Sequence, residues 1–138
     1  MSWFSEKILH VSWPSDFVIA YKLVPGCGGI SGPMPGELGA EETEKKGWAE
    51  FGTVTGRPRR AAEFDFNLAQ RAVMLNSATQ IAITKLDVRF PECSGVKSMN
   101  ELSSDAKSFI KNIEEKLEVP VTLIGTGPFV DDVVDLRT

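Results

Sequence analysis

The sequence predicts an α/β fold in which crossover helices join the strands of a partial, mostly parallel sheet. Three short apolar segments rich in Val, Ile and Ala alternate with two longer segments whose apolar residues recur every three or four positions. Strands and helices that alternate in this way pair in parallel through right-handed connections. The chain has 138 residues, 42% hydrophobic and 25% charged, which is enough to bury one core.

The first predicted strand covers residues 16–24, an apolar run that ends before a proline. Residues 26–36 are rich in Gly and Pro and therefore predict a loop, because glycine frees the backbone and proline removes a hydrogen-bond donor. A short charged helix is expected at residues 41–46, closed by Gly47-Trp48. Residues 52–60 then predict a second glycine-rich loop.

The middle of the chain predicts one helix followed by one strand. Residues 64–76 have helical spacing, and Asp65 suits the helix entrance. Residues 80–86 are rich in β-branched side chains and predict a strand that ends in Thr84-Lys85-Leu86-Asp87. The apolar face predicted for the helix consists of Phe64, Leu68, Ala69, Ala72, Val73 and Leu75.

The last third of the chain repeats this order of helix and strand. Ser104 and Asp105 open a helix that ends before Pro120. Residues 119–124 predict a buried strand, followed by the turn Gly125-Thr126-Gly127-Pro128. The predicted core face of the helix comprises Ala106, Phe109, Ile110, Ile113 and Leu117.

Two motifs follow the last two predicted strands. Thr84 to Asp87 ends one strand, and Gly125 to Pro128 follows the next. Ligands of open parallel sheets bind outside the carboxyl ends of the strands. We therefore expect these two motifs to form one pocket.

Composition argues against several functional classes. A formal net charge of −4 is unsuited to a dedicated nucleic-acid binder, which needs clustered Lys and Arg. No apolar run reaches the roughly 20 residues that cross a bilayer, so we expect a cytoplasmic protein without a membrane segment. His10 is the only histidine, which disfavours histidine-dependent catalytic devices, and no metal-ligand cluster is visible. Cys27 and Cys93 lack the spacing of zinc or redox sites, and we expect both to be reduced.

Lys85 and Asp87 have the chemistry that recognition of a guanine base requires. A single carboxylate can accept hydrogen bonds from both the ring N1–H and the exocyclic amino group of guanine, a donor pair that adenine lacks. The aliphatic stem of Lys85 can cover the flat face of the base while its ammonium stays in water. The alternative is that a Lys and an Asp after a strand simply form a turn or a solvated pair.

The Gly125-Thr126-Gly127-Pro128 motif also has two interpretations. Two glycines allow backbone amides and carbonyls to approach a flat base without obstruction from side chains. The same residues are common in ordinary turns, and the motif alone does not separate these possibilities.

The loop at residues 52–60 concentrates groups that bind anions. It reads Gly-Thr-Val-Thr-Gly-Arg-Pro-Arg-Arg and places three guanidiniums within four residues. Guanidinium groups bind carboxylates and phosphates through two parallel hydrogen bonds, and Thr hydroxyls and free amides can satisfy further oxygens. A solvated basic loop is the alternative, but in an acidic chain this cluster favours a local anion site.

Taken in order and spacing, the segments 51–60, 84–87 and 125–128 resemble the last third of adenylosuccinate synthetases, most of all the shorter archaeal branch. The similarity extends over residues 16–137 and leaves residues 1–15 unmatched, so we expect residues 16–138 to form the carboxy-terminal domain of that family. The family joins IMP to L-aspartate with GTP and magnesium through a 6-phosphoryl-IMP intermediate.

The resemblance implies a role for each motif. It assigns GTP binding to Arg59, Lys85, Asp87, Gly125, Thr126 and Gly127. It assigns IMP binding to Arg57, and aspartate binding to Thr53, Val54, Thr55, Gly56, Arg57 and Arg59.

The resemblance also indicates what this chain does not contain. Family members begin with a glycine-rich phosphate loop that bears the general base, followed by a histidine general acid, and neither has a counterpart here. Residues 26–31 contain no arginine where the family has one that touches IMP. We therefore expect no catalytic residue and no magnesium ligand within the chain, and negligible turnover by the chain alone.

Two functions follow from these observations. The first is an adenylosuccinate synthetase domain that supplies the guanine-binding and aspartate-binding loops. The alternative is a non-catalytic binding or assembly module that retains the fold and self-associates, because a partial sheet exposes an edge and apolar faces. Either way, a homo-oligomer or a partner chain that covers the exposed sheet is expected.

Overall fold

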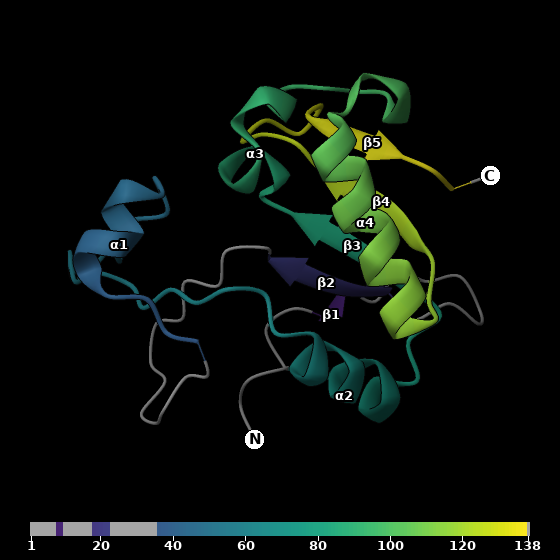
Figure 1. Cartoon of the computed structure of the whole chain (residues 1–138), viewed down its shortest axis with the longest axis horizontal. Helices are drawn as coiled ribbons and strands as arrows, with labels where there is room; N and C mark the ends of the chain where they lie inside the picture. The colour runs from purple at the N-terminus through teal and green to yellow at the C-terminus, as the bar shows by residue number, and fades with distance from the viewer. Residues whose placement is uncertain (1–7, 10–17, 23–35, 138) are drawn as a thin grey trace.

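The computed structural model describes residues 8–9, 18–22 and 36–137. It contains a five-stranded sheet in the order β1-β2-β3-β4-β5, in which β2, β3 and β4 are parallel and β1 and β5 add antiparallel strands at the two ends (Figure 1). The predicted α/β class and parallel pairing are confirmed. The strands are β1 (Ile8–Leu9), β2 (Val18–Lys22), β3 (Gln80–Thr84), β4 (Val121–Gly125) and β5 (Val133–Asp135).

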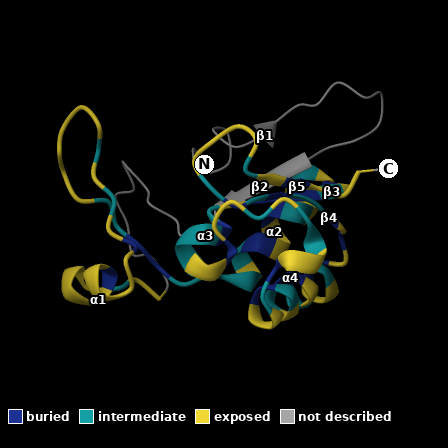
Figure 2. Cartoon of the chain, turned by 90° about the horizontal axis from the view of Figure 1, so that it is seen from above, coloured by how far each residue is buried: buried dark blue, intermediate teal, exposed yellow. Residues whose placement is uncertain are grey.

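Within the described residues, four α-helices and two short 3-10 turns lie between the strands. The helices are α1 (Ala40–Lys45), α2 (Phe66–Asn76), α3 (Leu86–Arg89) and α4 (Ser104–Leu117), and the 3-10 turns are Pro91–Cys93 and Met99–Glu101. Helices α2 and α4 lie on the same face of the sheet (Figure 2). This follows from the strand order, because successive right-handed crossovers that advance in one direction place their helices on one side.

The main core lies between α4 and the sheet. Ile110 and Ile113 of α4 pack with Ile81, Ile83 and Ile124, and all five are essentially inaccessible to solvent. Ala106 and Leu117 are also buried, so the predicted α4 face is confirmed. Its fifth member, Phe109, is half-buried and makes edge-to-face contacts with Phe64 and Phe66, with ring centroids 6.0 and 6.2 Å away.

Helix α2 begins as predicted but buries a different stripe. The Asp65 carboxylate accepts hydrogen bonds from the amides of Asn67 and Leu68, which satisfies two free donors at the helix start. The prediction for Leu75 is wrong, because this side chain is 62% exposed. Ala69 and Ala72 form the buried stripe, and Leu75 faces solvent because it lies about 120° around the helix from Ala69.

Several predicted boundaries shift by one or two residues. Strand β3 ends at Thr84 and not at residue 86, because Lys85 adopts a left-handed conformation (φ 63°) and Leu86 begins α3. Strand β4 begins at Val121 and includes Gly125. Of the first predicted strand, residues 18–22 are β2, and residues 16–17 and 23–24 lie outside the described residues. Of the predicted loop at residues 26–36, Gly36 is described, at φ 67°.

Residues 36–63, here called the arm, carry α1 and the second glycine-rich loop beside the end of the sheet from which α3 emerges (Figure 1). Trp48 is the buried centre of its attachment. The Lys46 ammonium lies 4.6 Å and the Arg89 guanidinium 5.5 Å from the centre of its ring. Glu63 pairs with both cations, at 2.5 Å from Lys46 Nζ and 2.8 Å from Arg89 Nη1, so α3 holds the arm.

Candidate functional site

The structure brings the two strand-ending motifs side by side. Strands β3 and β4 are neighbours, and Ile83 pairs with Ile124 directly before the motifs begin. A Cβ added to Gly125 would lie 3.5 Å from the Thr84 Cα and 3.5 Å from the Ile83 carbonyl oxygen. The two motifs therefore form one continuous surface at the carboxyl ends of parallel strands, the position where such sheets bind ligands.

Asp87 lies at this surface in the first turn of α3. The left-handed turn at Lys85 ends β3 abruptly and lifts the next residues out of the sheet. The Asp87 side chain is half-buried, and within the described residues its carboxylate has no hydrogen-bond or ion-pair partner. Its two oxygens are therefore available to a pair of donors.

Thr126 is built into the loop that follows β4. Its side chain is fully buried, and its hydroxyl donates to the carbonyl of Val96 at 2.7 Å. Its amide donates to the carbonyl of Asp132 at 2.9 Å, and its own carbonyl accepts from the amide of Gly95 at 3.0 Å. Thr126 thus holds the backbone of its two glycine neighbours in place.

Gly127 is fixed by a close approach to Asp132. A Cβ at residue 127 would lie only 2.3 Å from Asp132 Oδ2, so any side chain there would displace the carboxylate. Asp132 also accepts a hydrogen bond from the amide of Phe129, which closes the turn. The groups that Gly125 and Gly127 can offer to a ligand belong to the backbone.

The anion loop, residues 52–60, is a closed hairpin turn in the arm. The Arg59 amide donates to the Glu50 carbonyl at 2.7 Å, and the Gly52 amide donates to the Arg57 carbonyl at 2.9 Å. Gly56 adopts φ 62°, the left-handed region that its turn requires, and its amide donates to the Gly52 carbonyl at 2.8 Å. The tip of the loop is solvent-exposed and consists of Thr53, Val54, Thr55, Gly56 and Arg57.

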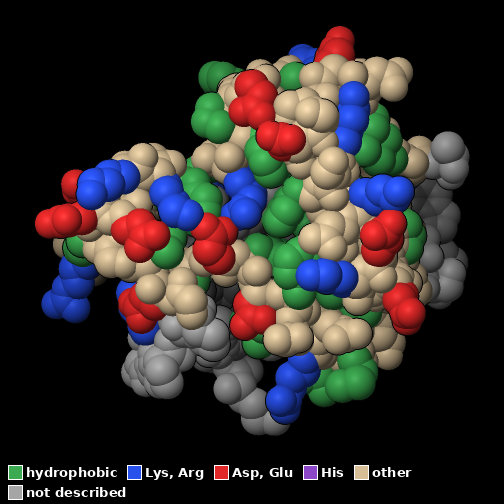
Figure 3. Space-filling view, in the orientation of Figure 1, with side chains coloured by type: hydrophobic (Ala, Val, Ile, Leu, Met, Phe, Trp, Pro, Cys, Tyr) green, Lys and Arg blue, Asp and Glu red, His purple; other side chains and the backbone are tan. Residues whose placement is uncertain are grey.

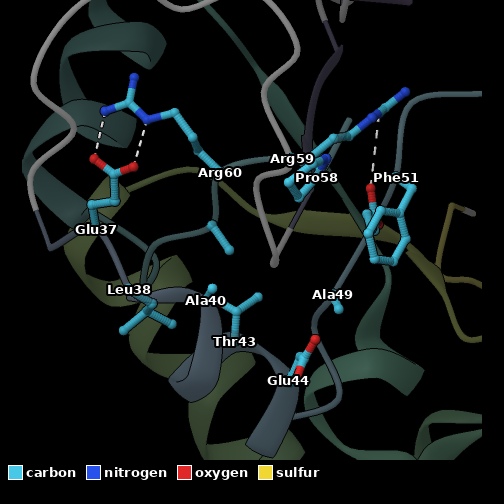
Figure 4. A pocket seen from close by; sticks show the side chains of 12 residues that line it. Glu37, Leu38, Ala40, Thr43, Glu44, Ala49, Phe51, Pro58, Arg59 and Arg60 are labelled. Carbon is cyan, nitrogen blue, oxygen red and sulfur yellow. Dashed lines mark hydrogen bonds and ion pairs between the residues drawn. The ribbon is translucent and has the colours of Figure 1, made fainter. Parts of the chain in front are cut away.

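The three arginines of this loop have different surroundings. Arg57 is exposed, and its guanidinium has no partner within the described residues. Arg59 is half-buried, with Nη1 3.8 Å from Glu50 Oε2. Arg60 binds Glu37 through two parallel hydrogen bonds of 2.5 Å, which lower the pKa of the Glu37 carboxyl (Figure 4). Arg57 is therefore the guanidinium presented to solvent.

A cavity of about 350 Å³ lies between α1 and the anion loop (Figure 4). Glu50 and Arg59 line it, whereas Lys85 and Asp87 do not. The candidate base site at the end of β3 thus lies outside this cavity. The remaining lining includes Leu38, Thr43, Phe51 and Pro58.

Glu50 is the site residue that the sequence did not reveal. Its carboxylate forms an ion pair with the Lys85 ammonium and also lies beside Arg59. It thereby joins the anion loop to the base surface, although it is 35 residues away from Lys85 in the chain. A single Glu before Phe51-Gly52 carries no pattern that distinguishes it from a solvated charge.

The charges around the site are mixed and local. Figure 3 shows Lys and Arg side chains interspersed with Asp and Glu over the visible face, without a broad field of one sign. In the described part of the chain, no group of three or more His, Cys, Asp or Glu residues is arranged to hold a metal ion. Cys93 is a buried free thiol, and Cys27 lies outside the described residues.

The helices of the described residues include none with the length and apolar character needed to span a bilayer.

Comparison with known proteins decides the family. The family model described as adenylosuccinate synthetase matches residues 20–92, which is more than half of the chain and extends from β2 to the 3-10 turn after α3. The chain belongs to the adenylosuccinate synthetase family. The match includes the anion loop and the motif at residues 84–87, and it confirms the resemblance inferred from the sequence.

Individual adenylosuccinate synthetases support the same assignment. The enzyme of Methanocaldococcus jannaschii is 50% identical over 122 residues, which cover 88% of this chain and 35% of that protein. The enzyme of Thermococcus sibiricus is 46% identical over 122 residues, which cover 88% of this chain and 36% of that protein. The chain thus spans about a third of the length of these adenylosuccinate synthetases.

Solved structures show the same fold. Fully ligated adenylosuccinate synthetase from Plasmodium falciparum aligns with a TM-score of 0.70 at 24% identity, over 84% of this chain and 38% of that one. Succinoaminodeoxyadenylate synthetase of cyanophage S-2L, bound to dGMP and to dATP as an energy donor, aligns with a TM-score of 0.58 at 25% identity. That alignment covers 88% of this chain and 33% of the phage protein.

Proposed function

We propose that this chain supplies the guanine-recognition and aspartate-recognition elements of an adenylosuccinate synthetase, which joins IMP to L-aspartate with GTP. The observation that carries the proposal is the partner-free carboxylate of Asp87 in the first turn of α3, three residues after Thr84, against which Gly125 at the end of β4 packs. Family membership makes GTP, IMP and aspartate the ligands to test.

At the base end, Asp87 accepts hydrogen bonds from N1–H and the exocyclic amino group of guanine. Lys85 places its aliphatic stem over the ring, and its ammonium points towards Glu50. Gly125 and Gly127 offer backbone groups to the base. Thr126 contributes by holding this backbone, because its hydroxyl is occupied by the Val96 carbonyl.

At the anion end, Arg57 binds the aspartate substrate and reaches towards IMP. Its guanidinium is exposed, and the neighbouring loop backbone is already ordered by internal hydrogen bonds, so little conformational freedom is lost on binding. Thr53, Val54, Thr55 and Gly56 supply hydroxyl and amide donors to the same ligand. Arg59 lies between the two ends and contributes to both the GTP and aspartate sites.

Magnesium assists this reaction when bound, by neutralising phosphate charge. The described residues contain no cluster of ligands for it, so no residue of this chain is assigned to the metal. The general acid, the general base and the phosphate loop are likewise not assigned to residues of this chain. We propose that the 138-residue polypeptide binds nucleotide weakly and does not complete the reaction alone.

A second candidate function is assembly. Phe129 and Val130 are 75% and 91% exposed directly after the base-site loop, and Met74 is 70% exposed on α2. Exposed apolar side chains of this size favour contact with another polypeptide, either a second copy or a partner chain. Sedimentation velocity of the chain across a concentration series tests this function, since a concentration-independent monomer would rule out self-association.

The proposed guanine recognition is tested by titrating the chain with GTP and, separately, with ATP. The proposed site contacts only the guanine base of the nucleotide. We therefore expect a dissociation constant of about 1 mM or weaker for GTP, corresponding to roughly −4 kcal/mol. ATP should bind more weakly still. Equal responses to the two nucleotides would refute guanine recognition and leave the assembly function.

A further inference from the structure

We propose that Glu50 is a positioning residue that links the base site to the anion site by holding Lys85 and Arg59 with one carboxylate. The inference rests on the proposed function, because it concerns how the two recognition elements act together.

The geometry around Glu50 joins three segments of the chain. Its Oε1 accepts a hydrogen bond from the Lys85 ammonium, and its Oε2 lies 3.8 Å from Arg59 Nη1. Its backbone carbonyl accepts the Arg59 amide at 2.7 Å. The Glu50 side chain is only 21% exposed, so this is a sheltered ion cluster and not a freely solvated pair.

This arrangement leaves Asp87 free. Lys85 precedes Asp87 by two residues in the chain. In the structure the ammonium is bound to Glu50, and the Asp87 carboxylate has no partner within the described residues. When the Glu50 charge is removed, the Lys85 ammonium loses this partner and can pair with the Asp87 carboxylate, and that pairing would block the base site.

The arm has other attachments besides the ion pair of Glu50 with Lys85. Glu63 pairs with Arg89 and Lys46, and the Arg89 guanidinium lies 4.5 Å from the centre of the Phe109 ring in the core. These contacts fix the arm from the far end of α3. Removing the Glu50 charge should therefore free the two cations while leaving the arm in place. Glu63 provides a control, because its substitution breaks two other ion pairs of the same arm.

The experiment uses the whole chain labelled with ¹⁵N, titrated with GTP in the absence and presence of saturating L-aspartate. The variants are Glu50→Gln, Glu50→Asp and the control Glu63→Gln. Because Glu50 holds cations of both sites, we expect L-aspartate to change the GTP affinity of wild type. We expect Glu50→Gln to weaken GTP binding about tenfold, the scale of one charge-assisted contact, and to abolish this effect of L-aspartate. Glu50→Asp should recover part of the GTP affinity and part of the aspartate effect. The GTP affinity of Glu63→Gln should stay within about twofold of wild type.

A double variant, Glu50→Gln with Lys85→Met, tests how Asp87 is kept free. Glu50→Gln alone should lose the preference for GTP over ATP, because Lys85 then pairs with Asp87. With the ammonium also removed, this preference should return, although overall affinity stays low. The inference is overturned if wild type binds GTP and Glu50→Gln binds it equally well. It is also overturned if Glu63→Gln loses as much GTP affinity as Glu50→Gln does. Absence of GTP binding by wild type would instead refute the proposed function, and this inference with it.

Discussion

Gly125 lies against Thr84, so that a Cβ at residue 125 would be 3.5 Å from the Thr84 Cα. This contact joins two motifs that are about 40 residues apart in the chain into one surface at the end of the parallel sheet. The surface carries the partner-free carboxylate of Asp87, and Glu50 connects it to the anion loop.

Asp87→Asn should remove the preference for guanine. The amide keeps the size of the side chain but loses the charge and one acceptor, so N1–H and the amino group of guanine can no longer both be satisfied. Charge-assisted hydrogen bonds contribute about 1.5–3 kcal/mol, which predicts at least a tenfold loss of GTP affinity with little change for ATP. Calorimetric titration with both nucleotides measures this difference.

Asp105→Asn is the matched control for that variant. Asp105 lies in the first turn of α4 and is exposed, as an ordinary helix-start acid is. Its substitution should leave nucleotide binding unchanged. Equal losses in the two variants would show that net charge, and not recognition by Asp87, controls binding.

Arg57→Ala should abolish binding of small dicarboxylates at the anion loop without altering the fold. The Arg57 guanidinium has no hydrogen-bond or ion-pair partner within the described residues, so its loss breaks no such interaction there. Shifts of the amides of residues 53–59 on addition of L-aspartate report binding. Arg71→Ala, an exposed arginine of α2, should behave as wild type, and persistence of the shifts in Arg57→Ala would refute the assignment.

Ile124→Ala should destabilise the chain by about 2–5 kcal/mol, because it opens a cavity in the fully buried layer between the sheet and α4. Leu75→Ala should cost less than about 0.5 kcal/mol, since this side chain is 62% exposed. Urea unfolding followed by circular dichroism compares the two variants. A large loss for Leu75→Ala would mean that α2 packs as the sequence pattern predicted.

Thr126→Val should destabilise the chain by about 1–3 kcal/mol, because the Val96 carbonyl loses its buried donor. Thr126→Ser keeps the hydroxyl and should recover most of this loss. Thermal unfolding of the pair separates the hydrogen bond from the methyl group. Full stability of Thr126→Val would contradict a structural role for the hydroxyl.

The attachment of the arm should weaken in acid. Burial opposes ionisation of Glu63, but hydrogen bonds from Lys46 and Arg89 outweigh it and lower its pKa below the ordinary 4.5. A depressed folded-state pKa stabilises the fold above the unfolded value and loses this contribution as pH falls through the folded value. We therefore predict that stability falls below about pH 4.5 and that Glu63→Gln reduces this fall.

Urea midpoints at pH 7 and at pH 3.5 measure this dependence for wild type and Glu63→Gln. Glu115→Gln, which removes an exposed ion pair with Lys111, is the control. Its urea midpoint should change between the two pH values as much as that of wild type. If Glu63→Gln loses as much stability between pH 7 and pH 3.5 as wild type does, groups other than Glu63 cause the acid sensitivity.

Much of the fold could be predicted because its signals are local. The spacing of Ile110, Ile113 and Leu117 predicted the buried face of α4, and Asp65 marked the start of α2. Strand β5 could not be predicted, because a strand of three residues has too little pattern and forms only by pairing with β4. The exposure of Leu75 depends on which side of α2 packs against the rest of the fold, and this is a tertiary effect.

Only part of the candidate site could be predicted, because some of its contacts join segments that are far apart in the sequence. The positions of Asp87 and Gly125 followed from their place after parallel strands. Glu50 became visible only when the fold placed the arm against Lys85, because contacts across long sequence separations leave no local pattern. The buried role of the Thr126 hydroxyl likewise depends on Val96, which is 30 residues away.

The most direct test of guanine recognition is a map of amide chemical-shift changes in the ¹⁵N-labelled chain on addition of GTP, with ATP at equal concentration as the reference. The account predicts GTP-specific changes at residues 84–89 and 125–127, with the nearby anion loop as the next region affected. Identical changes with GTP and ATP, or GTP-specific changes confined to other parts of the fold, would contradict it.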